Sequence, residues 1–150
     1  MGKIGIIRVR GLWGKSPKVR ETFRLLRLDR VNRCAVYEDT PSLRGMLDKV
    51  KDYATWGEID AKAFGMLVSK RGMSGNTRFS KAAEAKKLDA KAAAAEIFEG
   101  KKKYSDFGLT PYFKLTPPSG GYGTIKYKYP KGALGKRDAA EFASLVKSMC

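Results

Sequence analysis

Hydrophobic residues occupy both faces of the first segment of the chain, residues 3–10. Because successive side chains of a strand point to opposite sides, Ile4 and Ile6 fall on one face, and Ile7 and Val9 on the other. A strand that is apolar on both faces is typical of the centre of a sheet covered on two sides. The pattern therefore predicts a central strand at the start of the chain.

Two helices with the same kind of start follow this strand. Ser16-Pro17 and Thr40-Pro41 each place a hydroxyl group that can cap free N–H groups before a proline, which suits the first helical position. Residues 33–38 between the helices indicate a second strand. The core-facing stripes of the two helices are formed by Val19, Phe23 and Leu26, and by Leu43, Met46, Leu47 and Val50.

A third helix has two possible starts. The segment 55–58, Thr-Trp-Gly-Glu, has the spacing of a capping box, whereas Ile59 and Phe64 could form a hydrophobic staple around a start at Asp60. With either start the helix runs to about residue 70. Its inward side chains are Phe64, Leu67 and Val68, and Gly72 is its stop signal.

The composition shifts towards alanine, lysine and glutamate after a polar loop at residues 72–79. Residues 80–99 predict one long helix, because alanine and the charged residues favour helix. Its apolar face is thin and consists of Leu88, Ala92, Ala95 and Phe98. We expect an insertion that packs weakly at the edge of the core, followed by a basic hinge at residues 101–103.

The last third of the chain predicts two short strands and a helix. Residues 112–115 are a candidate third strand, and residues 124–129 alternate between apolar and lysine side chains after a proline- and glycine-rich turn. Residues 130–135 predict another loop. The final helix begins near Asp138, with Glu141 at capping-box spacing, and its apolar stripe is Phe142, Leu145, Val146 and Met149.

The composition adds a strong positive charge to this picture. The chain has 150 residues, enough for a single domain with a real core, and its formal net charge is +16, from 31 Lys and Arg against 15 Asp and Glu. Such a charge favours polyanionic partners, first nucleic acid and then an anionic membrane surface. No apolar run approaches the length of a membrane-spanning helix, and the N-terminus reaches charge too soon for a signal peptide, so we expect a soluble intracellular protein.

The positive charge is concentrated in two blocks. Residues 1–33 hold ten basic and two acidic side chains, and residues 99–137 hold nine and two. In the first block, Arg20, Arg24 and Arg27 form a ridge beside the buried stripe of the first helix, extended by Arg30 and Arg33 and flanked by Lys15 and Lys18. Ordinary solvated helix positions are the alternative, but the absence of compensating acids favours contact with phosphates.

The second block combines basic residues with glycines and tyrosines. Glycine lets a backbone approach a polyanion closely, and lysine supplies the opposite charge. Its basic residues are Lys126, Lys128, Lys131, Lys136 and Arg137. We expect the tyrosines of this block to lie in the core and its basic residues to contact RNA. Trp13 and Trp56 could stack on bases, although packing inside the protein is at least as plausible for both.

Residue types that usually carry catalysis are missing. Histidine is absent, so the chain lacks the usual general base and zinc ligand. The two cysteines, Cys34 and Cys150, have no metal-binding spacing and are expected to be free thiols. Residues 120–123, Gly-Gly-Tyr-Gly, lack the features of a nucleotide-binding loop. We therefore expect no enzyme activity, no metal, no cofactor and no small-molecule substrate.

Several strings of residues resemble the ribosomal protein L30 family of the large subunit. They are residues 3–11, with Pro17 and residues 25–28, and residues 38–46, with Val50. Residues 52–59 and 108–118 are similar to the longer archaeal form, which is related to the eukaryotic counterpart. The resemblance covers essentially the whole chain, least distinctively at residues 80–104. Each string alone is weak, but their combination in this order is specific.

The resemblance implies an α+β fold with a β-α-β-α-β core, a three-stranded sheet and a ferredoxin-like outline. Within a single domain, residues 1–60 and 108–118 would form the core, residues 60–107 a helical insertion before the third strand, and residues 119–150 the basic loop or strand and the C-terminal helix. The resemblance also implies a structural role in the cytoplasmic ribosome, contacting large-subunit ribosomal RNA and neighbouring ribosomal proteins. The absence of a long basic N-terminal extension favours an archaeal source.

The family's RNA-facing opening strand and loop correspond here to Arg8, Arg10, Trp13, Lys15 and Lys18, and Arg44 completes the expected RNA-binding set. A general nucleic-acid-binding protein of the chromatin type is the alternative, but it would need a groove-reading element that the sequence does not clearly supply. An RNA-modifying enzyme would need a base or a metal that is not found.

Overall fold

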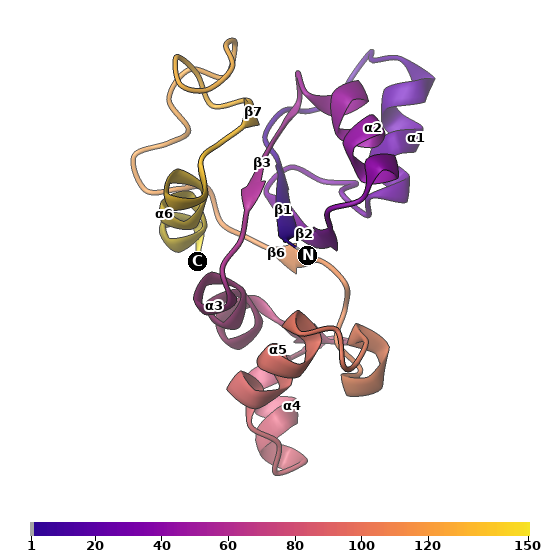
Figure 1. Cartoon of the computed structure of the whole chain (residues 1–150), viewed down its shortest axis with the longest axis vertical. Helices are drawn as coiled ribbons and strands as arrows, with labels where there is room; N and C mark the ends of the chain where they lie inside the picture. Colours follow the sequence, from indigo (N-terminus) through magenta and orange to yellow (C-terminus); the bar gives the residue numbers. More distant parts are fainter. Residues whose placement is uncertain (1) are drawn as a thin grey trace.

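A five-stranded mixed sheet forms the centre of the protein, in the order β6-β2-β1-β3-β7 (Figure 1). The computed structural model describes residues 2–150. The strands are β1 (Lys3–Arg8), β2 (Arg33–Glu38), β3 (Ala54–Glu58), β6 (Phe113–Lys114) and β7 (Gly135–Lys136). β1 is antiparallel to both neighbours, and β7 is parallel to β3. The predicted α+β class is confirmed, whereas the expected count of three strands was too low.

Helices cover both faces of this sheet. α1 (Pro17–Leu25) and α2 (Pro41–Val50) lie on one face, and α3 (Ala61–Arg71) and α6 (Ala139–Met149) lie on the other (Figure 1). The two predicted cap-and-proline starts are confirmed, because the hydroxyl of Ser16 accepts from the Lys18 N–H and that of Thr40 accepts from the Leu43 N–H.

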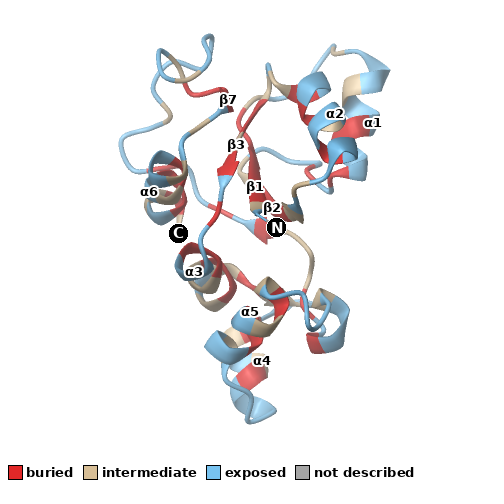
Figure 2. Ribbon diagram, in the orientation of Figure 1, coloured by how far each residue is buried: buried red, intermediate tan, exposed pale blue. Residues whose placement is uncertain are grey.

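The central position of β1 explains why it is apolar on both faces. Ile4 and Ile6 pack in a hydrophobic cluster with residues of α1 and α2. Ile7 packs on the other face of the sheet, in a second hydrophobic cluster with residues of α3 and α6. Within the sheet, Ile7 of β1 pairs with Cys34 of β2 on one side and with Thr55 of β3 on the other. The buried stretch in the middle of the sheet is visible in Figure 2.

The segment 55–58 is part of strand β3, so the capping-box interpretation was wrong. β2 pairs along one edge of β1, and the segment 55–58 pairs along the other edge. Gly57 also packs directly against Phe142 of α6, where an added Cβ would lie only 2.7 Å from the Phe142 Cβ. The alternative start was right: Asp60 precedes α3, although its side chain makes no capping hydrogen bond, and Gly72 follows the end of the helix.

Two short helices replace the single long helix predicted for residues 80–99. They are α4 (Phe79–Ala85) and α5 (Ala90–Phe98). Lys87 has a φ of 54° and the Leu88 N–H donates to the Ala83 carbonyl, which ends α4, and Asp89 then caps α5. The predicted apolar face was also wrong. Leu88, Ala92 and Ala95 are exposed and Phe98 is only half-buried, whereas Phe79, Ala83, Ala93, Ala94 and Ile97 are buried.

The rest of the insertion contains a hairpin and a turn of 3-10 helix. The expected loop at residues 72–79 instead holds strands β4 (Met73–Ser74) and β5 (Thr77–Arg78). The 3-10 helix η1 (Tyr104–Phe107) then leads to β6, which is shorter than the predicted strand at residues 112–115 and pairs with the start of β2.

The segment 124–129 is not a strand. It consists of turns with a single bridge between Lys128 and Leu134, and the tight fold brings Gly132 against the backbone of Tyr127. Its tyrosines are therefore less buried than expected, and Tyr127 is half exposed. Part of the expected loop at residues 130–135 enters β7. The buried stripe of α6 is confirmed, but Asp138 makes no capping hydrogen bond.

Candidate nucleic-acid interface

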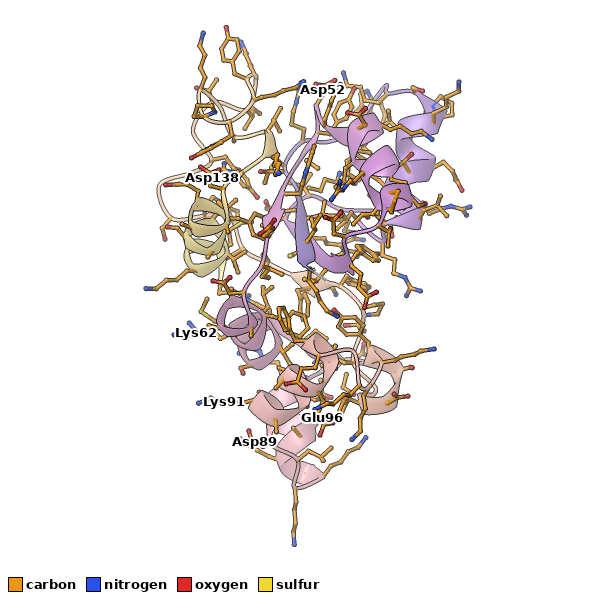
Figure 3. The ribbon with its side chains drawn as sticks, in the orientation of Figure 1. Asp52, Lys62, Asp89, Lys91, Glu96 and Asp138 are labelled. Carbon is orange, nitrogen blue, oxygen red and sulfur yellow. The ribbon has the colours of Figure 1, made fainter. Side chains whose placement is uncertain are left out.

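Basic residues from both ends of the chain meet at the end of the sheet where β1 finishes. The meeting point is the turn between α2 and β3, which contains Asp52 and Tyr53. Arg10 Nη1 donates to the Asp52 carbonyl at 3.4 Å, and Lys128 Nζ lies 4.0 Å from Asp52 Oδ1. We call this cluster, Arg10, Lys15, Asp52, Tyr53 and Lys128, the basic end. Asp52 marks its place at the top of the molecule in Figure 3.

The ring of Tyr53 holds two of these cations. The Arg10 guanidinium lies 5.7 Å from the ring centroid and Lys15 Nζ lies 5.8 Å from it. Cation–π contacts of this kind position a positive charge without neutralising it. These two cations therefore keep their positive charge available for a ligand.

Backbone hydrogen bonds fix the loop that carries the first basic block. The N–H groups of Val9 and Arg10 both donate to the Tyr53 carbonyl at 3.0 Å, so the segment just after β1 is held against the α2–β3 turn. Arg20, on the first turn of α1, donates from Nε to the Lys15 carbonyl at 3.2 Å. These contacts draw the loop and the start of α1 to one place.

The second basic block reaches the same place through β7. Because β7 pairs in parallel with the start of β3, the loop before it is carried to the α2–β3 turn. The bridge between Lys128 and Leu134 closes this loop, and Lys131 Nζ lies 4.5 Å from the ring of Tyr127. Lys126, Lys128 and Lys131 are all exposed. The two blocks therefore form one surface at this end of the molecule.

Among residues 2–150, Trp13 is the most exposed large hydrophobic residue, at 98%. The sequence left open whether Trp13 packs or stacks on a base, and packing inside the chain is now excluded. The exposed Lys18 lies beyond it, on the first turn of α1. An exposed indole beside free cations can stack on an unpaired base. Trp56, in contrast, packs against the cluster of α1 and α2.

Three of the expected RNA-binding arginines serve the fold. Arg8 is buried: it donates to the carbonyls of Leu28 and Arg10 and lies 5.2 Å from the ring of Phe23. The loss of water on burial lowers the Arg8 pKa. The positive charge of Arg8 therefore interacts with groups inside the protein.

Arg137 and Arg33 are similarly engaged. Arg137 donates to the Thr55 hydroxyl at 3.0 Å and to the Ala133 carbonyl at 3.2 Å, and burial lowers its pKa. Arg33 stacks 4.5 Å from the ring of Tyr112. These side chains hold the ends of β7 and β2 in place.

The arginine ridge on α1 differs from the prediction in two ways. Acids do compensate part of it, because Arg24 forms an ion pair with Glu21 at 2.7 Å and Arg33 forms one with Asp29 at 3.4 Å. Arg27 lies beyond the end of the helix, with a φ of 58°. The ridge is thus shorter and less positive than the sequence indicated.

The remaining expected residues are not part of the basic end. Arg44 makes a two-pronged ion pair with Asp39 at the start of α2, which lowers the pKa of Asp39 and raises that of Arg44. Arg30 is exposed in the loop before β2, and Lys136 is exposed on the edge strand β7. Asp52 and Tyr53 were not among the expected site residues, because neither β3 nor the turn before it was recognised in the sequence.

Two other features bear on the class of protein. In the described part of the chain, residues 2–150, no group of three or more His, Cys, Asp or Glu side chains is arranged to hold a metal ion. Within the same range, none of the helices combines the length and apolar character needed to cross a bilayer.

Known proteins are similar to this chain along most of its length. The sequence profile of the family described as ribosomal protein L30p/L7e matches residues 4–54, from β1 to the start of β3. A "Large ribosomal subunit protein uL30" of Methanocella arvoryzae is 37% identical over 149 residues, covering 96% of this chain and 97% of that protein. The protein of the same name from Methanococcus maripaludis is 40% identical over 138 residues, covering 88% and 90%.

Proposed function

Since the chain belongs to the ribosomal protein L30p/L7e family, we propose that it is a structural constituent of the large ribosomal subunit that binds ribosomal RNA through its basic end. The two relatives named above are archaeal proteins, which agrees with the source expected from the sequence. As part of the ribosome the protein works in the cytoplasm, with ribosomal RNA and other ribosomal proteins around it. We infer no catalytic role for it.

The observation that carries the RNA-binding proposal is the convergence on the Asp52–Tyr53 turn. Arg10 and Lys15 come from the first basic block and Lys128 comes from the second, yet all three contact this turn. Cations gathered from distant parts of a chain on one rigid edge suit a folded polyanion, because they present several charges at fixed spacing. Trp13 adds a group that can stack on an exposed base.

A supporting role in assembly follows from the same geometry. The basic end joins the loop after β1, the turn before β3 and the loop before β7, so RNA bound there would contact three separate segments of the fold. Such binding stabilises the folded chain by an amount that grows with the logarithm of its affinity, because the unfolded chain cannot present the same surface.

Binding of the purified protein to large-subunit ribosomal RNA, measured from 50 to 400 mM salt, tests the proposal. We expect affinity to fall steeply with salt, and to be higher for the structured ribosomal RNA than for random duplex DNA. The Lys15→Glu/Lys128→Glu variant should lose most of this binding, whereas Lys81→Glu/Lys86→Glu, on α4 and directly after its end, should lose far less. Equal affinity for random duplex DNA at physiological salt would instead support the alternative, a general nucleic-acid-binding protein.

A further inference from the structure

A groove of about 710 Å³ lies between the core and the helical insertion, away from the basic end. One wall comes from Arg27 and the start of α2, and the opposite wall comes from the segment between α5 and β6. β2 forms the floor. Its apolar lining includes Val36, Leu43, Met46, Ile97, Leu109 and Pro111.

The cations of this groove fall into two kinds. Lys3 contributes to an ion pair with Glu38 at 3.8 Å, and Lys102 pairs with Glu96 at 2.8 Å, so both charges are partly neutralised. Glu96 is labelled in the lower part of Figure 3. Arg27 and Lys103 line opposite walls, and within residues 2–150 neither forms an ion pair. The groove therefore has an uncompensated positive charge on each side.

Arg27 is held at its wall by the backbone. After the end of α1 its φ is 58°, the Arg27 N–H donates to the Arg24 carbonyl, and the Leu28 N–H donates to the Phe23 carbonyl. This is the usual helix ending in which glycine is favoured at the left-handed position. An arginine there accepts a backbone conformation that is unfavourable for a residue with a Cβ. The basic end does not explain this placement, because Arg27 lies apart from it.

We propose that this groove binds an unpaired nucleotide of the RNA, with its base against the apolar lining and its flanking phosphates at Arg27 and Lys103; the proposal rests on the RNA-binding function above. A groove that combines an apolar lining with cations on two sides matches a single nucleotide, which has an apolar face and a charged backbone. The volume lies in the range of pockets that enclose small organic ligands.

The apolar lining argues against duplex RNA as the occupant. A duplex presents phosphates and sugars on its outside and keeps the faces of its bases stacked inside. It could contact the two cations but would leave the apolar lining facing charged groups. Tyr37 and Tyr104 line the groove as well, and Tyr37 is fixed by donating its hydroxyl proton to the Leu26 carbonyl at 2.9 Å. Aromatic side chains in such a groove favour a base.

A pair of charge-matched variants tests this inference in the full chain. Arg27→Asn/Lys103→Gln removes both free cations, and asparagine tolerates the left-handed conformation at residue 27. Lys87→Asn/Lys81→Gln is the control, because Lys87 also has a positive φ, of 54°, and lies between α4 and α5. Both variants lose two positive charges. The probes are a uridine octamer that contains 4-thiouridine and an RNA duplex of eight base pairs.

We expect Arg27→Asn/Lys103→Gln to lower affinity for the octamer by roughly 10- to 30-fold at 0.1 M salt, and to reduce the log–log salt slope by about 1.4, since each phosphate contact on a single strand contributes about 0.7. Affinity for the duplex should match that of the control. The 4-thiouridine should crosslink to the groove, at Met46 or Tyr104, in the wild-type protein. Ser105→Glu, at an exposed position of the lining, should weaken octamer binding without removing any packing.

The groove proposal would be overturned if the octamer bound equally to the Arg27→Asn/Lys103→Gln variant and the control, or if the crosslinks fell only at Trp13. Equal losses for octamer and duplex would also contradict it, because they would indicate general electrostatic attraction. Failure of the proposed function would look different: the wild-type protein would not enter large ribosomal subunits.

Discussion

Lys128 and Asp52 form an ion pair across the surface where the two basic blocks meet, with 4.0 Å between Nζ and Oδ1. Asp52 is the acid at the centre of a cationic cluster, and its carbonyl group also accepts from Arg10. The pair aligns the loop before β7 with the turn before β3. It also lowers the net charge of the surface that we propose binds RNA.

Replacing Asp52 by asparagine should therefore tighten RNA binding. The variant removes one negative charge from the basic end but keeps the backbone carbonyl that Arg10 uses. We expect affinity for ribosomal RNA to rise by about two- to fivefold at low salt, the range for one exposed charge. Filter binding against salt concentration measures this. Glu84→Gln, an exposed acid on α4, is the matched control and should change affinity less. A weaker complex with Asp52→Asn would mean that the acid positions Lys128 more than it repels phosphate.

Trp13 should contribute to binding but not to folding. Because its side chain is 98% exposed, Trp13→Ala should leave the free energy of unfolding unchanged within about 0.5 kcal/mol. If the indole stacks on a base, the same change should lower RNA affinity by roughly 5- to 150-fold, from about 1–3 kcal/mol of stacking. Trp56→Ala, at a partly buried position, should instead lower stability. Unaltered RNA affinity of Trp13→Ala would exclude stacking.

The same substitution at two glycines should have opposite effects on stability. At Gly57 an added Cβ would meet the Phe142 side chain at 2.7 and 3.0 Å, and the Arg137 carbonyl at 3.1 Å. We expect Gly57→Ala to lower the free energy of unfolding by about 1–3 kcal/mol. At Gly65, in α3, nothing lies within 4 Å of that position, so Gly65→Ala should raise it by up to about 1 kcal/mol. Urea unfolding of both variants checks this, and a stable Gly57→Ala would contradict the close packing of α6 on β3.

The two cysteines should differ in reactivity. Cys34 is fully buried, and burial raises its pKa well above the ordinary range, whereas Cys150 is only half-buried. A thiol reagent at pH 8 should modify Cys150 first and Cys34 only after unfolding. Reaction of both thiols at equal rates in the native protein would contradict the burial of β2.

Cys34 should also make stability depend on pH. The folded state keeps its proton at a pH where the unfolded chain has lost it, so the unfolded state binds fewer protons. Above the ordinary thiol pKa the free energy of unfolding should therefore fall as pH rises. Cys34→Ala should reduce this decline between pH 8.5 and 9.5, below the range where tyrosines ionise. If the free energy of unfolding declined equally in Cys34→Ala, the decline would arise from other ionisable groups.

The elements that the sequence predicted well are those whose signals are local. Ser16 and Thr40 cap their own helices, and the stripe of α6 needs only helical spacing. The segment 55–58 was misassigned, because its strand state depends on the free edge of β1 and on Phe142, both distant in the chain. The break at Lys87 was also missed, since helix propensity alone predicts continuation there.

For the site, too, the local features could be predicted and those that depend on distant residues could not. The two basic blocks could be predicted from the sequence, because charge is a property of composition. Which cations remain free could not, because it depends on partners far along the chain: Leu28 for Arg8, Thr55 for Arg137 and Tyr112 for Arg33. The contact between the blocks at Asp52 likewise depends on the pairing of β7 with β3.

Crosslinking inside intact ribosomes tests most directly whether both blocks bind one RNA element. A photoreactive amino acid would replace Trp13 in one variant and Tyr127 in another, and the attached nucleotides would be read by reverse transcription. We expect both positions to crosslink to the same or directly adjacent elements of large-subunit ribosomal RNA. Crosslinks to two separate RNA regions, or from only one of the two positions, would contradict it.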